Sequence, residues 1–389
     1  MLDFIFSIGI LLFGFVFIHI NKKGQTKQDL IKLKKLWIYH IFFILLFYFY
    51  SQSNSADAVG YWRVAKNSTE GGFLFYLFKG SGTSFIYVIN YFPAKILGLS
   101  FFSGMMFYGL LGFIGFWFFY RVITDLIPYN SKFYKFNLFP LLFFLPNMHF
   151  WSAAVGKDTL MFFCIGLFSF SLLKIYKRFP LIIASSFLMY MTRPHVIIIL
   201  LFSFSLAFLF SRKINNFKKI IFTSLLVGIV IIILPKVLEY VNLEEESTVS
   251  DVISRSKSQA THLSGENIGS SIDISSYPYP LKVLSFLFRP LFFDYNGLFS
   301  LFSSFENLLL LLLTIRVIRR DFLKSFRNSP VIIKGLTYFL IFGALIFSLS
   351  LSNLGIILRM KNMFTPGFLI FILWNLSYQN DNKLHNKIK

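Results

Sequence analysis

Residues 2–20 read LDFIFSIGILLFGFVFIHI, and this stretch decides the fold class. It approaches the ~20 apolar residues that a helix needs to cross a bilayer. Asp3 stands near its start and Lys22 and Lys23 follow it, so the basic start of a secretory signal peptide is missing. Because positive residues stay on the cytoplasmic side, this order predicts an outer N-terminus and a cytoplasmic loop at 21–36.

The whole chain shares this apolar character. Of its 389 residues, 56% are hydrophobic and only 14% are charged, and the mean hydropathy is +0.67. Soluble domains carry about 25% charged residues. These values exclude a disordered, collagen-like or disulfide-rich chain and predict an all-α, polytopic transmembrane helical bundle. The single cysteine, Cys164, excludes an internal disulfide, and the histidines show no metal-ligand spacing.

Eleven apolar segments are predicted to span the membrane, which places the C-terminus in the cytoplasm. They are 2–20, 37–51, 101–120, 137–149, 159–173, 179–192, 196–211, 220–235, 297–315, 331–351 and 363–378. Segments 84–98 and 281–293 are apolar but short, and Pro93 and Pro290 interrupt them. We expect these two segments to form interfacial or re-entrant helices on the outer face.

The net charge of +21 follows from this topology. Most Lys and Arg residues fall in the predicted cytoplasmic loops, whereas the outer segments balance cations with acids, as the positive-inside rule requires. The excess charge attracts anionic membrane lipid and needs no nucleic-acid partner. The chain is predicted to be a single integral-membrane domain, 1–389, with a large outer loop at 236–296.

Ionisable residues near the predicted spans are candidate site residues, because a charge inside a bilayer costs ~2.5–3.5 kcal/mol. Six polar clusters fall toward the outer side of the predicted bundle. They centre on Asp57, on Lys157-Asp158, on Arg193 to His195, on Arg289, on Glu306-Asn307 and on Asn353 to Asn362, which includes Arg359. Simpler explanations stay open for each of them: an acid in the first turn of a helix, a snorkelling cation, an interfacial anchor or an ordinary loop acid.

These residue types suit phosphate chemistry at a membrane surface. Arginine grips phosphate through paired hydrogen bonds and lysine adds a point charge. The candidate phosphate ligands are Lys157, Arg193, Arg289 and Arg359. The candidates for a general base that activates a hydroxyl are Asp57, Asp158, His195 and Glu306. Trp62, Trp151 and Tyr295 are candidates for stacking on sugar rings, although interfacial aromatic belts supply the same residues. No metal and no cofactor is expected.

The layout resembles bacterial O-antigen and capsule repeat-unit polymerases, within the wider GT-C class of membrane glycosyltransferases. The resemblance rests on the all-membrane layout, the 236–296 outer loop, Trp151 to Asp158, Arg193-Pro194, Arg289-Pro290 and the Arg359 segment followed by Pro366. It implies transfer of a glycan from undecaprenyl pyrophosphate onto the next lipid-linked repeat unit, on the outer face of the bacterial cytoplasmic membrane. The arginines would hold pyrophosphate, and an acid or histidine would activate the acceptor.

Three other functions stay open. A GT-C-type transferase that moves one sugar from a polyprenyl-phosphate donor would favour Asp57 as its base. A lipid-linked oligosaccharide flippase would carry charged residues through both leaflets, whereas the unusual charges here gather toward one side. An assembly protein without chemistry would scatter its outer cations. Membrane lipid is an expected partner, and a chain-length regulator or a flippase is an open candidate for a protein partner.

Overall fold

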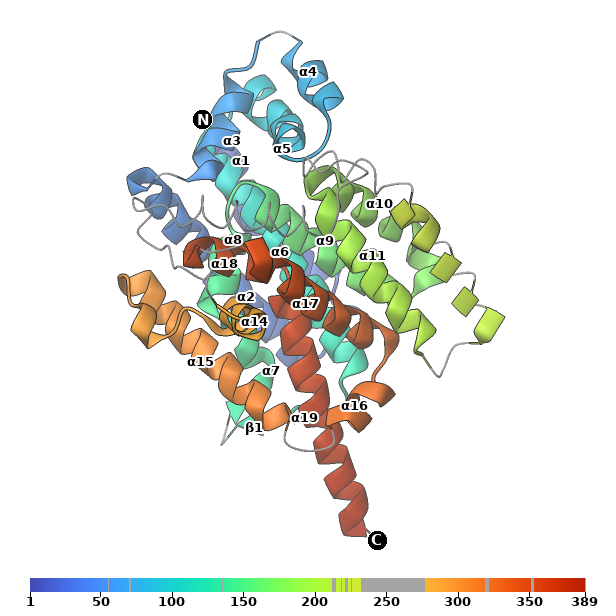
Figure 1. Ribbon diagram of the computed structural model, residues 1–389. Helices are drawn as coiled ribbons and strands as arrows, with labels where there is room; N and C mark the ends of the chain where they lie inside the picture. The colour runs from blue at the N-terminus through green and yellow to red at the C-terminus, as the bar shows by residue number, and fades with distance from the viewer. Residues whose placement is uncertain are drawn as a thin grey trace. The chain divides into compact units, whose positions relative to one another are not determined.

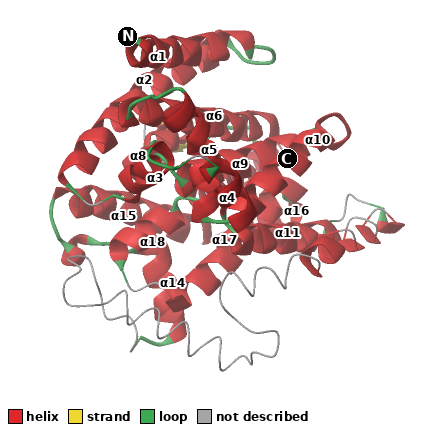
Figure 2. Cartoon of the chain, turned by 90° about the horizontal axis from the view of Figure 1, so that it is seen from above, coloured by secondary structure: helices red, strands yellow, loops and turns green. Residues whose placement is uncertain are grey.

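The computed structural model describes the chain except for residues 55, 70, 134–135, 212–214, 218, 221–222, 225, 232–276, 319–321, 351–352 and 389. Most of the predicted outer loop at 236–296 and parts of the predicted span at 220–235 therefore lie outside the described residues. The chain divides into two compact units. Unit 1 comprises 1–124 and 140–194, and unit 2 comprises 125–139 and 195–389. Helices make up nearly all of the described chain, which confirms the all-α prediction there (Figure 2).

Unit 1 is built from helices, and Figure 1 labels its α-helices. They are α1 (Leu2–Ile20), α2 (Lys27–Ser53), α3 (Asp57–Lys66), α4 (Gly72–Lys79), α5 (Thr83–Asn90), the π-helix η1 (Tyr91–Ile96), α6 (Phe101–Leu126), the 3-10 helix η2 (Leu142–Phe144), α8 (Pro146–Ser152), α9 (Lys157–Leu172) and α10 (Ile175–Thr192). Helices α9 and α10 pack side by side, and α2 packs on both α1 and α8.

Unit 2 holds the remaining elements. They are the strands β1 (Lys132–Phe133) and β2 (Phe136–Asn137), then α11 (Pro194–Leu209), α14 (Tyr279–Phe288), the 3-10 helix η3 (Phe292–Asp294), α15 (Leu298–Ile318), α16 (Phe322–Asn328), α17 (Val331–Ser350), α18 (Leu354–Lys361) and α19 (Thr365–Ile388). The two strands form a short antiparallel pair. The four-residue helix α7 (Leu138–Leu141) lies across the division between the units.

Several helices are long and apolar enough to cross a membrane. Four of the described helices meet this condition alone, namely Leu2–Ile20, Phe101–Leu126, Leu298–Ile318 and Val331–Leu349. The total rises to six if each of two bent pairs counts as one span, α8 with α9 and α18 with the first part of α19. The described helices thus give the chain membrane-spanning character, while the predicted eleven spans and their orientation stay a prediction.

One predicted span differs in the structure. Residues 137–149 do not form one helix but fall into α7, η2 and the start of α8. Phe139, before Pro140, has extended backbone angles, as does Leu145 before Pro146. Proline clashes with a helical residue before it, so both prolines break the apolar run. The two short segments are helical in part: α5 and η1 cover most of 84–98, and α14 ends at Phe288 before Arg289-Pro290.

Glycines on α6 let neighbouring helices of unit 1 approach closely, as small residues do in membrane helix bundles. A methyl group on Gly112 would lie 2.0 Å from the Ser152 carbonyl oxygen of α8. On Gly109 it would meet Ile44 of α2 at 2.2 Å. The core of unit 1 therefore depends on backbone contact along α6.

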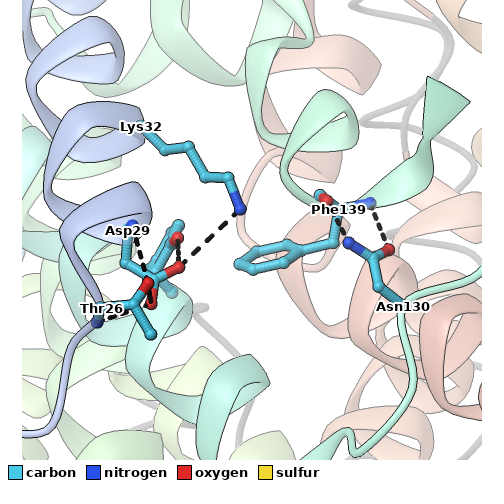
Figure 3. Close-up of polar contacts among 6 residues, drawn as sticks. Thr26, Asp29, Lys32, Asn130 and Phe139 are labelled. Atoms are coloured by element: carbon cyan, nitrogen blue, oxygen red, sulfur yellow. Dashed lines mark hydrogen bonds and ion pairs between the residues drawn. The ribbon is translucent and has the colours of Figure 1, made fainter.

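Side-chain hydrogen bonds stabilise the start of α2 and the loop before α7, and Figure 3 shows both sets of contacts. The Thr26 hydroxyl caps α2 by accepting from the Asp29 backbone N–H at 3.1 Å, and Asp29 accepts in return from the Thr26 backbone N–H at 3.0 Å. Lys32 lies 3.9 Å from the Asp29 carboxylate. In unit 2, the Asn130 side chain pairs with the backbone N–H and carbonyl of Phe139, which closes the loop that carries β1 and β2.

Candidate functional site

The bend between α8 and α9 displays two predicted site residues in unit 1. The axes of these helices differ by 109°. Gly156 supports the bend with a φ of 142°, a backbone region that glycine adopts without strain. The Thr159 hydroxyl donates to the Ala154 carbonyl at 2.6 Å and closes the turn. Lys157 and Asp158 consequently begin α9, with Lys157 half-buried and Asp158 buried.

Arg193 meets Asp158 in a buried ion pair. Arg193 ends α10, and because α10 packs on α9, its Nη2 reaches Asp158 Oδ1 at 2.6 Å. Each side chain is only 7% exposed. A carboxylate in such a pair is held by its partner, so Asp158 is better placed to orient Arg193 than to accept a proton from a substrate.

Asp57 lies in the same unit, at the start of α3, and is exposed. Tyr61 follows one turn later on the same face of α3. The Tyr61 ring packs on the α8–α9 bend, since a methyl group on Gly156 would lie 2.9 Å from it. Asp57, Lys157 and the Arg193–Asp158 ion pair therefore belong to one unit, although they come from separate parts of the sequence.

Three tyrosines pack on one another in the same part of unit 1. The Tyr87 ring of α5 lies 6.3 Å from Tyr61 and 4.9 Å from Tyr76 of α4, measured between ring centres. Burial raises the pKa of Tyr87, and the charges of Tyr76 and Asp57 add to this shift. The Tyr87 phenol therefore stays protonated at neutral pH, within electrostatic reach of Asp57. The sequence offered no signal for these tyrosines, because short separate helices supply them.

The two tryptophans predicted to stack on sugars differ in exposure. Trp62 is 2% exposed; its ring packs on Gly104 of α6, and its N–H donates to the Leu99 carbonyl. Trp62 therefore belongs to the core of unit 1 and offers no ring face to a sugar. Trp151 is half-buried at the end of α8, against Phe150 and Phe47, and among the described residues its N–H has no hydrogen-bond partner.

Unit 2 contains a second arginine pair, between Arg289 and Asp294. Arg289 Nε donates to Asp294 Oδ2 at 2.9 Å and its Nη2 donates to Oδ1. Asp294 also accepts from the Leu291 backbone N–H, so a short turn builds the pair. The hydrogen bond to Asp294 raises the pKa of Arg289 and keeps the guanidinium charged. Among the described residues, its Nη1 contacts the Tyr277 hydroxyl at 3.4 Å.

A buried lysine holds the backbone around Arg289. Lys361, at the end of α18, donates to Asn307 Oδ1 at 2.5 Å and to the Leu287 carbonyl at 3.2 Å, and it lies 3.5 Å from the Arg289 carbonyl. The Asn307 amide in turn donates to the Pro290 carbonyl at 2.8 Å. The sequence marked both polar clusters as unusual but favoured Arg359 over Lys361, because spacing alone does not show which side of α18 faces inward.

The remaining predicted residues of unit 2 lie around this cluster. Glu306 is buried in α15 and interacts electrostatically with Lys361. Arg359 is half-buried and precedes Lys361 by two residues, so the two side chains leave α18 on nearly opposite sides. His195 begins α11 with its ring against Phe347, and Tyr295 is 62% exposed.

The predicted residues therefore fall into two groups. Unit 1 contains Asp57, Lys157, Asp158 and Arg193, of which Asp158 and Arg193 are in contact, and unit 2 contains His195, Arg289, Glu306 and Arg359. The expectation of one outward-facing site that joins all of them stays a prediction. Within the described part of the chain, no group of three or more His, Cys, Asp or Glu residues could hold a metal ion. Family models, curated proteins and solved structures contain no match to this sequence.

Proposed function

We propose that the protein is a membrane glycosyltransferase that polymerises undecaprenyl-pyrophosphate-linked oligosaccharide repeat units on the outer face of the bacterial cytoplasmic membrane. The observation that carries this proposal is the unit 1 cluster, where exposed Asp57, half-buried Lys157 and the Arg193–Asp158 pair belong to one packed unit. A base and two cations are the groups that displacement of a pyrophosphate by a hydroxyl requires.

In the proposed reaction, an acceptor sugar hydroxyl attacks the anomeric carbon of the donor glycan. The new glycosidic bond forms as the bond to the pyrophosphate oxygen breaks, and Asp57 takes the hydroxyl proton. Lys157 and Arg193 stabilise the charge that grows on the departing undecaprenyl pyrophosphate, and Asp158 orients Arg193. The Tyr87 hydroxyl and the half-buried Trp151 are available to a sugar.

Arg289 supports a reaction with two lipid-linked substrates. Its Asp294 partner neutralises one edge of the guanidinium, which lies beside the rings of Tyr277 and Phe293. A polymerase handles two pyrophosphates, one on the donor and one on the acceptor, and in the described part of the chain each unit contains an arginine–aspartate pair. A transferase that moves one sugar from a polyprenyl phosphate shares Asp57 as its base but needs a single phosphate cluster.

The direct test removes the proposed base. Cells that depend on the chain for surface polysaccharide are complemented with Asp57→Asn, which keeps the size of the side chain but abolishes its basicity. We expect loss of long glycan chains, since general-base catalysis contributes ~10²–10⁴-fold, together with accumulation of single lipid-linked repeat units. Gel separation of the surface glycan measures the chain length, and an antibody to a terminal tag measures the protein in the membrane.

Asp125→Asn is the matched control, because Asp125 is also an exposed acid but lies at the end of α6, outside the cluster. Its glycan should match that of the wild type. Normal chain length with Asp57→Asn would remove Asp57 as the base. Loss of a single sugar from otherwise normal glycan, after deletion of the whole chain, would favour the single-sugar transferase.

A further inference from the structure

Two histidines that lie 109 residues apart in the sequence meet in the core of unit 1. His40 of α2 and His149 of α8 are both fully buried, and their Nδ1 atoms lie 2.8 Å apart. This distance is that of a nitrogen–nitrogen hydrogen bond, so one ring donates and the other accepts. Neither histidine belongs to the arginine clusters, and the proposed transfer reaction does not use them.

The surrounding backbone decides which ring donates. His149 Nε2 lies 2.7 Å from the Phe143 carbonyl oxygen, which only accepts, so this nitrogen carries a proton. In a neutral ring, His149 Nδ1 is then the acceptor. His40 Nδ1 must therefore donate, and His40 Nε2 is left as a bare lone pair.

That lone pair has no hydrogen-bond donor. His40 Nε2 is buried without a hydrogen-bond partner among the described residues. The Gly109 carbonyl of α6 is close enough to the His40 ring to serve as a backbone acceptor, so a proton on Nε2 would have an acceptor nearby. Native proteins rarely leave a buried nitrogen unsatisfied, so this atom calls for an explanation.

Aromatic rings pack against both histidines. Phe116 of α6 stacks on His149 with ring centres 4.1 Å apart and planes 11° apart, and its ring also meets His40 edge-on at 5.5 Å. The ring centre of Trp37 lies 6.4 Å from that of His40. The faces of aromatic rings attract positive charge and partly replace the lost water.

Among the described residues, the groups that contact the pair are uncharged. Tyr39 of α2 is the titratable group that faces His149, with ring centres 4.8 Å apart, and its hydroxyl donates to the Phe144 carbonyl. The contacts from α6 come from Phe116 and from the backbone near Gly109 and Gly112, and those from η2 come from Phe143.

We propose that His40 and His149 form a proton-binding pair, in which His40 Nε2 takes one proton from solvent water and the Nδ1–Nδ1 hydrogen bond shares the charge with His149. Buried ionisable residues in membrane helices commonly serve in proton relays. His149 lies on α8, the short arm of the α8–α9 bend, and α9 begins with Lys157 and Asp158. Proton uptake therefore acts on the segment that carries the unit 1 cluster.

Nitrogen-15 NMR of the full-length protein labelled at histidine, in lipid nanodiscs, tests this arrangement. At neutral pH we expect a proton on His40 Nδ1 and on His149 Nε2, and bare nitrogens at His40 Nε2 and His149 Nδ1. On acidification, resonances of both rings should move together at one midpoint as the pair takes up a single proton. The exposed His19 on α1 should titrate separately, and His19→Gln identifies its signals.

A single substitution tests whether the two histidines titrate as a coupled pair. In His149→Gln, the joint transition should disappear and His40 should titrate at a different midpoint. Three outcomes contradict the proposal: a proton on His40 Nε2 at neutral pH, no uptake by either ring before the protein unfolds, or unchanged titration of His40 in His149→Gln. Stoichiometric shifts of both rings on addition of Zn²⁺ alone at constant pH would instead show a metal site. The wild-type measurement does not depend on whether a variant folds, and none of these readouts requires glycosyl transfer.

Discussion

The two arginine–aspartate pairs have the same chemistry but different origins. Arg193 and Asp158 are 35 residues apart, are each 7% exposed and meet only because α10 packs on α9. Arg289 and Asp294 are five residues apart, and a turn that also uses the Leu291 N–H holds them. The first pair is therefore a product of tertiary packing, whereas the second is built locally within one turn.

The largest expected effect is loss of stability on breaking the packed pair. Arg193→Ala removes the guanidinium that donates to the buried Asp158 carboxylate, and breaking a buried ion pair costs about 3–5 kcal/mol of unfolding free energy. Thermal unfolding in detergent measures the change. The double variant Arg193→Met with Asp158→Leu replaces both charges with apolar groups and should recover most of the loss. Equal stability of Arg193→Ala and wild type would show that Asp158 has another adequate partner.

The next effect concerns binding at the local pair. Arg289→Ala and Arg289→Lys should both shorten the glycan, because lysine keeps the charge but cannot reproduce the paired hydrogen bonds of the guanidinium. A lost charge-assisted bond of about 1.5–3 kcal/mol slows the reaction roughly ten- to more than a hundredfold. Chain length on gels measures this effect, with the amount of protein in the membrane as control. Full activity of Arg289→Lys would reduce Arg289 to an interfacial anchor.

The sequence predicted features that depend on local pattern. The bounds of α1 matched the apolar run 2–20, since a continuous apolar segment leaves few alternatives. Residues 137–149 do not form the single predicted span, because Pro140 and Pro146 interrupt the helix despite the apolar composition. Lys157 and Asp158 were correctly expected at a helix start.

Features that depend on packing could not be predicted in this way. The Asp158–Arg193 and His40–His149 contacts join residues on different helices, and no spacing in the sequence encodes them. Trp62 resembled an interfacial aromatic residue, but Gly104 admits its ring into the core. The sequence marks Lys361 and Asn307 as unusual polar residues. Their hydrogen bonds to each other and to the backbone beside Arg289 form only when α14, α15 and α18 pack together.

A third acid, Asp29, is expected to give the smallest effect, because it is partly exposed and most of its contacts come from its own helix end. Asp29 lies before the apolar part of α2 and accepts hydrogen bonds from the Tyr120 hydroxyl at 2.6 Å and the Thr26 hydroxyl at 2.7 Å. Partial burial acts to raise the pKa of Asp29, but these bonds outweigh it and place the pKa below its ordinary value of 3.8. The folded protein therefore holds the Asp29 proton less readily than the unfolded chain.

The stabilisation from ionised Asp29 should accordingly be complete above pH 3.8 and should be lost as the pH falls through the lower folded value. We expect Asp29→Asn to be less stable than wild type by about 1 kcal/mol at about pH 6, and the difference to shrink by about pH 3. Thermal unfolding of both proteins across this range measures it. Lys32→Ala should cost no more than about 0.5 kcal/mol, because its 3.9 Å contact with Asp29 is partly exposed. A difference between Asp29→Asn and wild type that stays constant with pH would show that hydrogen-bond geometry, not the charge of Asp29, stabilises the start of α2.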